Sequence, residues 1–303
     1  MSNTVLADLQ IVPRSTVDQN SLPLNAFSVD VEEWFQVGAF ETTLNREDWP
    51  HLESRVEHQT LKILKILEES SVSATFFCLG WVAERHPALL RSISDAGHEI
   101  GSHGMDHRRI FALTAQDFDQ DIRRTKGLLE DTSGSRVKGY RAPSFSMNSD
   151  TWSYYQLLEK AGYLYSSSVV PAKTDHYGMK GLPRVPFYPI SDSNFIEVPM
   201  TVAQIGAKTL PSSGGGYFRL LPQFFSRFLM KKAYAQTGIG TIFYMHPWEI
   251  DPDQPFVREA PLVSRIRHYS FQARMAGKIS KLLTEGQFTR IDRLLVDQFS
   301  VEI

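Results

Sequence analysis

Two histidines and two carboxylates in this sequence have the types and spacing of a metal site. His103 and His107 are four residues apart, so both imidazoles can reach one cation if the segment is helical or tightly turned. Asp30 and Glu32 are two residues apart in an alternating stretch, and such residues point to the same side of a strand. Together they suit a catalytic zinc or similar divalent ion, whereas each pair alone equally fits exposed loop histidines or a solvated strand end.

An arginine and a third histidine could complete a hydrolytic site. If one carboxylate binds the metal, the other is free to act as general base toward the metal-bound water. Arg141 could hold that base in place, although a surface ion pair is the commoner role of an arginine after a strand. His246 ends an apolar stretch and could protonate a leaving amine, the alternative being a hydrogen-bonded core histidine.

Other polar or reactive residues have simpler interpretations. His98 is predicted to be structural, and Cys78 lies in an apolar stretch, where packing is a better prediction than reactivity. No Gly-Lys-Ser/Thr follows the glycine run 214–216, so the run predicts a tight turn or a close approach of the backbone to a ligand rather than a phosphate loop. The absence of a Gly-x-Ser-x-Gly motif argues against a serine hydrolase.

Alternating strand and helix patterns supply the elements that must position these residues. Strands are predicted at 26–32, 73–79, 99–102, 137–141 and 241–245, and helices at 55–69, 87–96, 114–130 and 149–161. This order is typical of parallel βαβ units and predicts an α/β fold. Asp30, His103, Arg141 and His246 then lie near the carboxyl ends of strands, where α/β barrels carry their active sites.

Composition narrows the class of protein. The 303 residues are 42% hydrophobic and carry a net charge of −2, so no basic excess points to nucleic acid. A single cysteine fits a reducing compartment. The start of the chain lacks a secretory signal pattern, and no apolar stretch approaches the ~20 residues of a spanning helix. We therefore expect a soluble, cytoplasmic protein without a transmembrane segment.

Three regions are expected along the chain. Residues 1–22 are polar and aperiodic and are predicted to form a tail, and residues 23–250 hold the strand–helix units. Pro and acidic residues concentrate at 251–261, and mostly helical, basic sequence follows, so 251–303 is predicted to be a C-terminal extension.

Taken as an ordered set, these motifs resemble the polysaccharide deacetylase family, also called the NodB-homology family. The resemblance covers about residues 27–248 and includes the phrases ATFFCLGW, GHEIGSHG and GYRAPSFS. The phrases SVDVEEWFQV, GGGYFRLLP and SRIRHYSFQARM are similar to a bacterial branch found with exopolysaccharide and exosortase gene clusters. The resemblance implies a distorted (β/α) barrel with fewer than eight regular strands and metal-dependent hydrolysis of N-acetyl groups on amino sugars.

The resemblance also implies roles for individual residues. A divalent metal, expected to be zinc, would be held by Glu32, His103 and His107, with Asp30 as base, Arg141 steadying it and His246 as acid. The commoner family pattern has two adjacent aspartates, but Val31 occupies the second position here. Some relatives space the carboxylates by one residue, which assigns the ligand role to Glu32.

The substrate expected from this resemblance is an acetylated amino-sugar oligosaccharide or polysaccharide. Trp34, Phe145 and Trp248 could stack on sugar faces, although core packing is the commoner role of such aromatics. Ser144 follows the Arg-Ala-Pro segment and is also expected to contact substrate. Nucleic acid is not expected as a partner. Peripheral association with a polysaccharide-synthesis complex is expected. Two alternatives remain: a metal-poor amidohydrolase of a small cyclic amide, and a non-catalytic carbohydrate-binding barrel.

Overall fold

The fold is built on one sheet whose central strands run parallel. The computed structural model describes residues 9–15, 22–173 and 178–303. Seven strands form a continuous parallel path in the order β8-β6-β5-β4-β3-β2-β11. They are β2 (Leu24–Val31), β3 (Thr75–Cys78), β4 (Glu99–Ser102), β5 (Gly139–Tyr140), β6 (Tyr165–Ser166), β8 (Ile196–Glu197) and β11 (Ile242–Met245). The predicted α/β class is confirmed.

The path is not closed into a complete barrel by strand pairing. Within the described ranges no ladder joins β8 to β11, and an irregular segment lies beside β11 instead. Gly214 in that segment forms a parallel bridge with Tyr244, and Ser212 N donates to the carbonyl of Thr201 at 3.1 Å. The remaining strands are β1 (Gln10–Ile11) and β7 (Phe187–Tyr188) at the antiparallel edge, β12 (Gln287–Thr289) beside β2, and the separate pair β9 (Val202–Ile205) and β10 (Lys208–Pro211).

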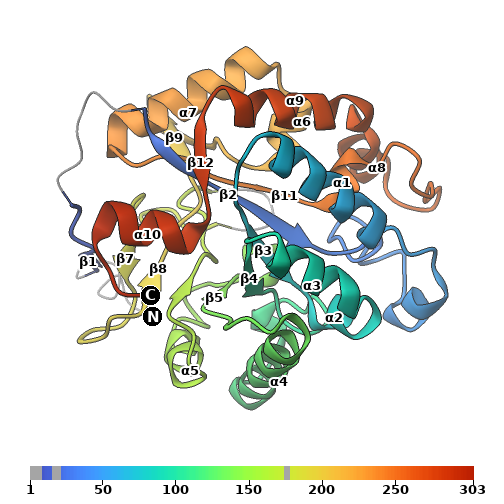
Figure 1. The fold of residues 1–303 in the computed structure, drawn as a ribbon, viewed down its shortest axis with the longest axis horizontal. Helices are drawn as coiled ribbons and strands as arrows, with labels where there is room; N and C mark the ends of the chain where they lie inside the picture. Colours follow the sequence, from blue (N-terminus) through green and yellow to red (C-terminus); the bar gives the residue numbers. More distant parts are fainter. Residues whose placement is uncertain (1–8, 16–21, 174–177) are drawn as a thin grey trace.

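Helices pack around this sheet (Figure 1). They are α1 (Val56–Glu69), α2 (Gly80–Arg85), α3 (Pro87–Asp95), α4 (Ala115–Ser133), α5 (Tyr154–Lys160), α6 (Gly215–Leu220), α7 (Gln223–Thr237), α8 (Leu262–Tyr269), α9 (Gln272–Thr284) and α10 (Ile291–Phe299). Within the described residues, four 3₁₀ turns each lie between a strand and the helix that follows it: η1 (Arg46–His51), η2 (Ile110–Ala112), η3 (Pro143–Phe145) and η4 (Pro247–Ile250).

Local sequence explains where these helices begin and end. The Thr114 hydroxyl accepts a hydrogen bond from Asp117 N at 3.1 Å and caps α4, which ends at Gly134 with φ 69°. The helix predicted at 149–161 begins later, at Tyr154. The reason is a local turn in which Asn148 Oδ1 accepts hydrogen bonds from the backbone N–H groups of Asp150 and Thr151.

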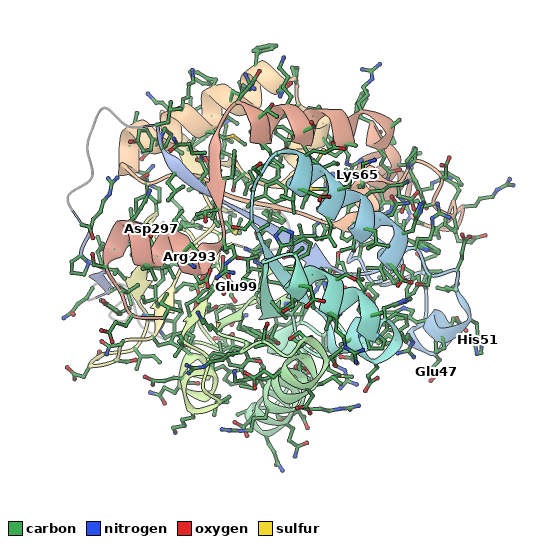
Figure 2. The ribbon with its side chains drawn as sticks, viewed as in Figure 1. Glu47, His51, Lys65, Glu99, Arg293 and Asp297 are labelled. Atoms are coloured by element: carbon green, nitrogen blue, oxygen red, sulfur yellow. The ribbon has the colours of Figure 1, made fainter. Side chains whose placement is uncertain are left out.

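The C-terminal region is part of the sheet and its core. Strand β12 pairs parallel with Leu24–Ala26 of β2, and Ile291, Leu294 and Leu295 of α10 are fully buried. The buried carboxylate of Glu99 accepts hydrogen bonds from Thr75 and Tyr165 and lies in the interior, whereas Arg293 and Asp297 on α10 are exposed (Figure 2). The part of the predicted C-terminal extension that forms β12 and α10 thus belongs to the sheet and its core.

The N-terminal region has a different relation to the sheet. Most of the predicted tail, residues 1–8 and 16–21, lies outside the described residues, but Gln10–Ile11 pairs with β7.

None of the helices within the described ranges has both the length and the apolar character of a membrane span.

Truncation of a buried side chain in α10 tests whether the C-terminal region stabilises the domain. Leu294→Ala is expected to lower the free energy of unfolding by about 2–5 kcal/mol, because a fully buried leucine is lost from the core. Val296→Ala, on the exposed side of the same helix, should change it by less than about 0.5 kcal/mol. Denaturant unfolding of both variants measures this, and equal small effects would show that α10 adds little.

Candidate active site and metal centre

Strand ends bring the predicted site residues to one edge of the sheet. Asp30 lies in the last two residues of β2 and Glu32 directly follows that strand. His103 follows β4, Arg141 follows β5 and His246 follows β11. These strands are close neighbours in the order β5-β4-β3-β2-β11 and run parallel, so their carboxyl ends meet.

Glu32, His103 and His107 form a compact group that could hold a metal ion. One potential ligand atom from each residue lies within 4.8 Å of the others. The segment between the histidines is a tight turn rather than a helix, with positive φ at Gly104 (77°) and His107 (58°). All three side chains are buried, and a predicted ligand set from distant parts of the chain therefore converges in space.

The donor atoms in this group have the chemistry that a divalent cation needs. His103 Nδ1 donates to the backbone carbonyl of Arg141 at 2.8 Å, which leaves Nε2 with a free lone pair. Burial lowers the pKa of His103 to about 4, so the ring is neutral at pH 7. Glu32 Oε2 lies 2.8 Å from His107 Nε2, yet within the described residues no donor reaches this buried oxygen with hydrogen-bond geometry.

The Glu32 carboxylate is charged in this setting. Burial by itself raises the pKa of Glu32, but the neighbouring His107 and His246 outweigh burial and lower the pKa to about 2. Trp248 Nε1 donates to the other carboxylate oxygen, Oε1, at 3.2 Å. One oxygen is thus hydrogen-bonded and the other is available, an arrangement that fits a monodentate metal ligand.

Asp30 is held apart from this group by a buried arginine. Arg141 Nη1 donates to Asp30 Oδ1 at 2.6 Å and to Ser28 Oγ at 2.9 Å, and Arg141 Nε donates to the carbonyl of Ser167 at 3.1 Å. The guanidinium lies over the Phe77 ring at 4.1 Å and is fully buried. The side chains of Arg141 and Asp30 are therefore held in one orientation. A fixed orientation is what Asp30 needs to act as a general base.

His246 faces both carboxylates. Its Nε2 lies 3.5 Å from Glu32 Oε1 and 3.9 Å from Asp30 Oδ2, and its Nδ1 lies 2.9 Å from Glu249 Oε1. Burial lowers the pKa of His246, but Glu32, Glu249 and Asp30 together outweigh burial and raise it to about 9. The imidazolium form, which can donate a proton, is thus favoured at neutral pH.

A second buried arginine supports this histidine. Arg219 Nε donates to Glu249 Oε2 at 3.3 Å, and its remaining N–H groups donate to the carbonyls of Arg267, His268 and Ser270. A Cβ atom at Gly215 would collide with the Glu249 carboxylate. The backbone of the glycine run thus closely approaches Glu249, a residue of the site, and its predicted approach to a ligand stays a prediction.

Sequence reasoning missed four supporting residues: Ser28, Ser167, Glu249 and Arg219. Two of them carried a readable signal. Ser28 shares a strand face with Asp30, and Glu249 lies three residues after His246 in a tight His-Pro-Trp-Glu turn. Ser167 and Arg219 become neighbours only through tertiary structure.

The residues expected to contact sugar have different environments. Trp34 is only 4% exposed and packs against Phe35 and Phe40, so its position favours core packing, the alternative role, over stacking on a sugar. Phe145 is also buried, edge-on against Tyr244, and offers no open face for a sugar.

Two of the expected substrate contacts remain accessible. Ser144 lines a small pocket beside the metal group together with His107, Gly38 and Arg109. Its φ of 53° lies in a sparsely populated backbone region, and such strain concentrates at functional sites. Trp248 is half-buried and stacks on His246 at 5.0 Å between ring centroids. Their contact with substrate stays a prediction.

His98 and Cys78, which are predicted to have structural roles, are both buried. His98 Nδ1 accepts a hydrogen bond from Ala74 N at 3.1 Å, and burial lowers the pKa of His98 to about 4. Cys78 is fully buried in β3, and burial raises the pKa of its thiol well above the usual range.

Comparison with known proteins matches two families along the chain. Residues 44–165 match the polysaccharide deacetylase family, and residues 167–296 match a domain of unknown function, DUF3473. Residues 44–165 therefore carry the sequence of a polysaccharide deacetylase domain. The candidate site draws on both matched regions, since His103 and Arg141 lie in the first and His246 in the second.

Individual relatives agree with this assignment. The chain is 31% identical over 109 residues to the peptidoglycan deacetylase of Helicobacter pylori, covering 36% of each chain. It is 34% identical over 103 residues to the peptidoglycan-N-acetylglucosamine deacetylase of Bacillus cereus, covering 34% of this chain and 36% of that protein. The matches thus span about a third of the length of these curated relatives.

A solved structure shares the fold. The crystal structure of a Mycobacterium smegmatis protein assigned as a polysaccharide deacetylase superposes with a TM-score of 0.60 and 19% sequence identity. The superposition covers 94% of this chain and 93% of that one. The likeness therefore extends over the deacetylase domain and the C-terminal region together.

Metal analysis of two variants distinguishes the neighbouring carboxylates. Glu32→Ala is expected to lose most of its bound divalent metal, because the available Oε2 ligand is removed. Asp30→Asn should keep the metal, because Asp30 is held by Arg141 and does not belong to the ligand group. Elemental analysis of purified protein measures both, and the reverse result would assign Asp30 as the ligand.

Proposed function

We propose that this chain is a metal-dependent N-deacetylase that removes acetyl groups from amino sugars of a polysaccharide or its oligosaccharide precursor. The observation that carries the proposal is that the strand ends hold a potential metal-ligand group and a separate carboxylate with a different partner. A Glu-His-His group lies beside a separately held carboxylate, and one imidazole faces both within 3.9 Å. The named deacetylases among the relatives support the same chemistry.

Glu32, His103 and His107 would hold the ion. We propose zinc, because neutral imidazoles and one carboxylate are typical ligands of catalytic zinc sites. When bound, a divalent ion there polarises the acetamide carbonyl and increases the acidity of water.

Asp30 and His246 would carry the proton transfers. Asp30 accepts a proton from the attacking water, and Arg141 keeps the carboxylate oriented. The water oxygen bonds to the carbonyl carbon, and the carbon–nitrogen bond then breaks. His246 Nε2 donates a proton to the departing amine nitrogen, so the products are acetate and a free amino sugar.

The two alternative functions lack comparable support. A metal-poor amidohydrolase of a cyclic amide does not need a buried carboxylate oxygen without a hydrogen-bond donor beside two histidines. A non-catalytic binding barrel does not need a buried arginine holding a carboxylate against a charged imidazole, because burying such groups is costly without a catalytic use.

Acetate release from acetylated chito-oligosaccharides tests the proposed reaction. Chelator treatment should abolish release and added zinc should restore it. Asp30→Asn should lower kcat by about 10²–10⁴-fold through loss of the base. Asp131→Asn, an exposed carboxylate on α4, is the matched control and should leave kcat unchanged. Full turnover in metal-free protein would contradict the proposal.

Glu249 is predicted to act as a positioning residue for His246. Glu249→Gln should lower kcat by about tenfold or more, but less than His246→Ala, because the imidazolium loses its charged partner at Nδ1. Metal content should be unchanged, since Glu249 lies outside the ligand group. Glu259→Gln, an exposed glutamate in the nearby loop, serves as control. An unaltered kcat in Glu249→Gln would show that His246 needs no such partner.

A further inference from the structure

Helix α8 presents its apolar side chains to solvent instead of to the core. Of its eight residues only His268 is buried. Leu262, Val263 and Ile266 are 62%, 60% and 56% exposed, respectively. A helix of a globular protein normally turns its apolar stripe inward, and large exposed apolar patches mark interaction sites. The apolar side of α8 therefore requires an explanation other than core packing.

Neighbouring elements carry further exposed apolar side chains. Phe224 and Phe228 are four residues apart on α7, so they share a face of that helix, and both are exposed. Helix α6 contacts both α7 and α8 and so lies between them, and Figure 1 shows α7 and α9 along the upper edge with α8 at the right. We call the exposed apolar residues of α6, α7, α8 and the residue before α9 the apolar face; they are Tyr217, Leu220, Phe224, Phe228, Leu262, Val263, Ile266 and Phe271.

The segments that carry the apolar face are also basic. Residues 198–248 contain no acidic residue, and neither do residues 260–284, although the whole chain has a net charge of −2. Together the two segments hold ten basic residues: Lys208, Arg219, Arg227, Lys231, Lys232, Arg265, Arg267, Arg274, Lys278 and Lys281. Arg219 is buried against Glu249, and Arg227 pairs with Glu285, but Lys231, Lys232 and Arg274 are exposed.

We propose that the apolar face docks on the surface of an anionic lipid bilayer. Exposed phenylalanine and aliphatic side chains beside lysine and arginine are the composition of interfacial helices, which insert the apolar groups among acyl chains and pair the cations with headgroups. A second copy of this chain is a poorer occupant, because a two-fold interface would bring the same basic surface against itself.

The apolar face adjoins the site at the strand ends. His268 of α8 stacks on Trp248 at 4.3 Å between ring centroids, and Trp248 stacks on His246. Docking through α8 would therefore hold the His246 side of the site close to the membrane surface. The docking itself does not depend on the function proposed above, and it is measured without substrate.

Vesicle co-sedimentation tests the proposal with the full chain. Protein should bind vesicles of phosphatidylcholine containing phosphatidylglycerol, bind phosphatidylcholine alone weakly, and bind less as salt is raised. Lys231→Glu with Lys232→Glu should weaken binding by about 25-fold or more, at about fivefold for each lost cation. The pairs Phe224→Ser with Phe228→Ser and Leu262→Ser with Ile266→Ser should lose most binding, because the inserted apolar area is removed.

Matched controls carry the same substitutions elsewhere. Arg123→Glu with Arg124→Glu reverses two adjacent charges on α4, and Leu61→Ser with Phe111→Ser removes two exposed apolar groups from α1 and η2. Both controls should bind like the parent protein, and thermal unfolding should show that all variants are folded. No binding of the parent to anionic vesicles at low salt would overturn the proposal. The proposal would also be overturned if the control variants lost as much vesicle binding as the variants of the apolar face. Self-association of the parent protein that only the variants of the apolar face lose would overturn it as well.

Discussion

The buried ion pair between Arg141 and Asp30 is the contact on which the rest of the site depends. It joins β2 to the loops after β5 and β6, because the guanidinium also contacts Ser28 and Ser167. The backbone carbonyl of the same arginine fixes the tautomer of His103. Removal of either charge would leave the other buried without a partner, at a cost of about 3–5 kcal/mol. One residue thus positions both the candidate base and a candidate ligand.

A second buried ion pair, between Arg219 and Glu249, positions His246. Glu249 holds the imidazole, and Arg219 holds Glu249 while binding three carbonyls at the end of α8. This chain of contacts links the candidate acid to the helix whose apolar residues face outward. Orientation of the acid and placement of the proposed docking surface therefore rest on the same small set of polar contacts.

The spacing of the two carboxylates follows from strand geometry. Val31 lies between them and is fully buried in the core cluster formed with Phe27 and Val29. Side chains alternate along a strand, so a carboxylate at position 31 would point into that core. Placing the second carboxylate one residue further keeps both on the polar side, where Asp30 meets Arg141 and Glu32 meets His107.

The sequence by itself determined the strand–helix alternation and the residues at the strand ends. These signals are local. They are the alternation of apolar and polar residues in 26–32, the helical spacing of apolar residues in 55–69 and the threonine at 114 that can cap a helix. Parallel strands then place Asp30, His103, Arg141 and His246 at one edge, as predicted. Family resemblance, rather than spacing, assigned the ligand role to Glu32.

Tertiary structure alone decided which groups support that set and which side chains reach solvent. Ser167 and Arg219 touch the site from positions 26 and 30 residues away from their partners, so no local pattern reveals them. From the sequence, Trp34 could stack on a sugar or pack in the core, and the structure places it in the core, whereas Leu262 and Ile266 are exposed. A periodic pattern shows that a helix has an apolar side, but only packing determines whether that side meets the core or the solvent.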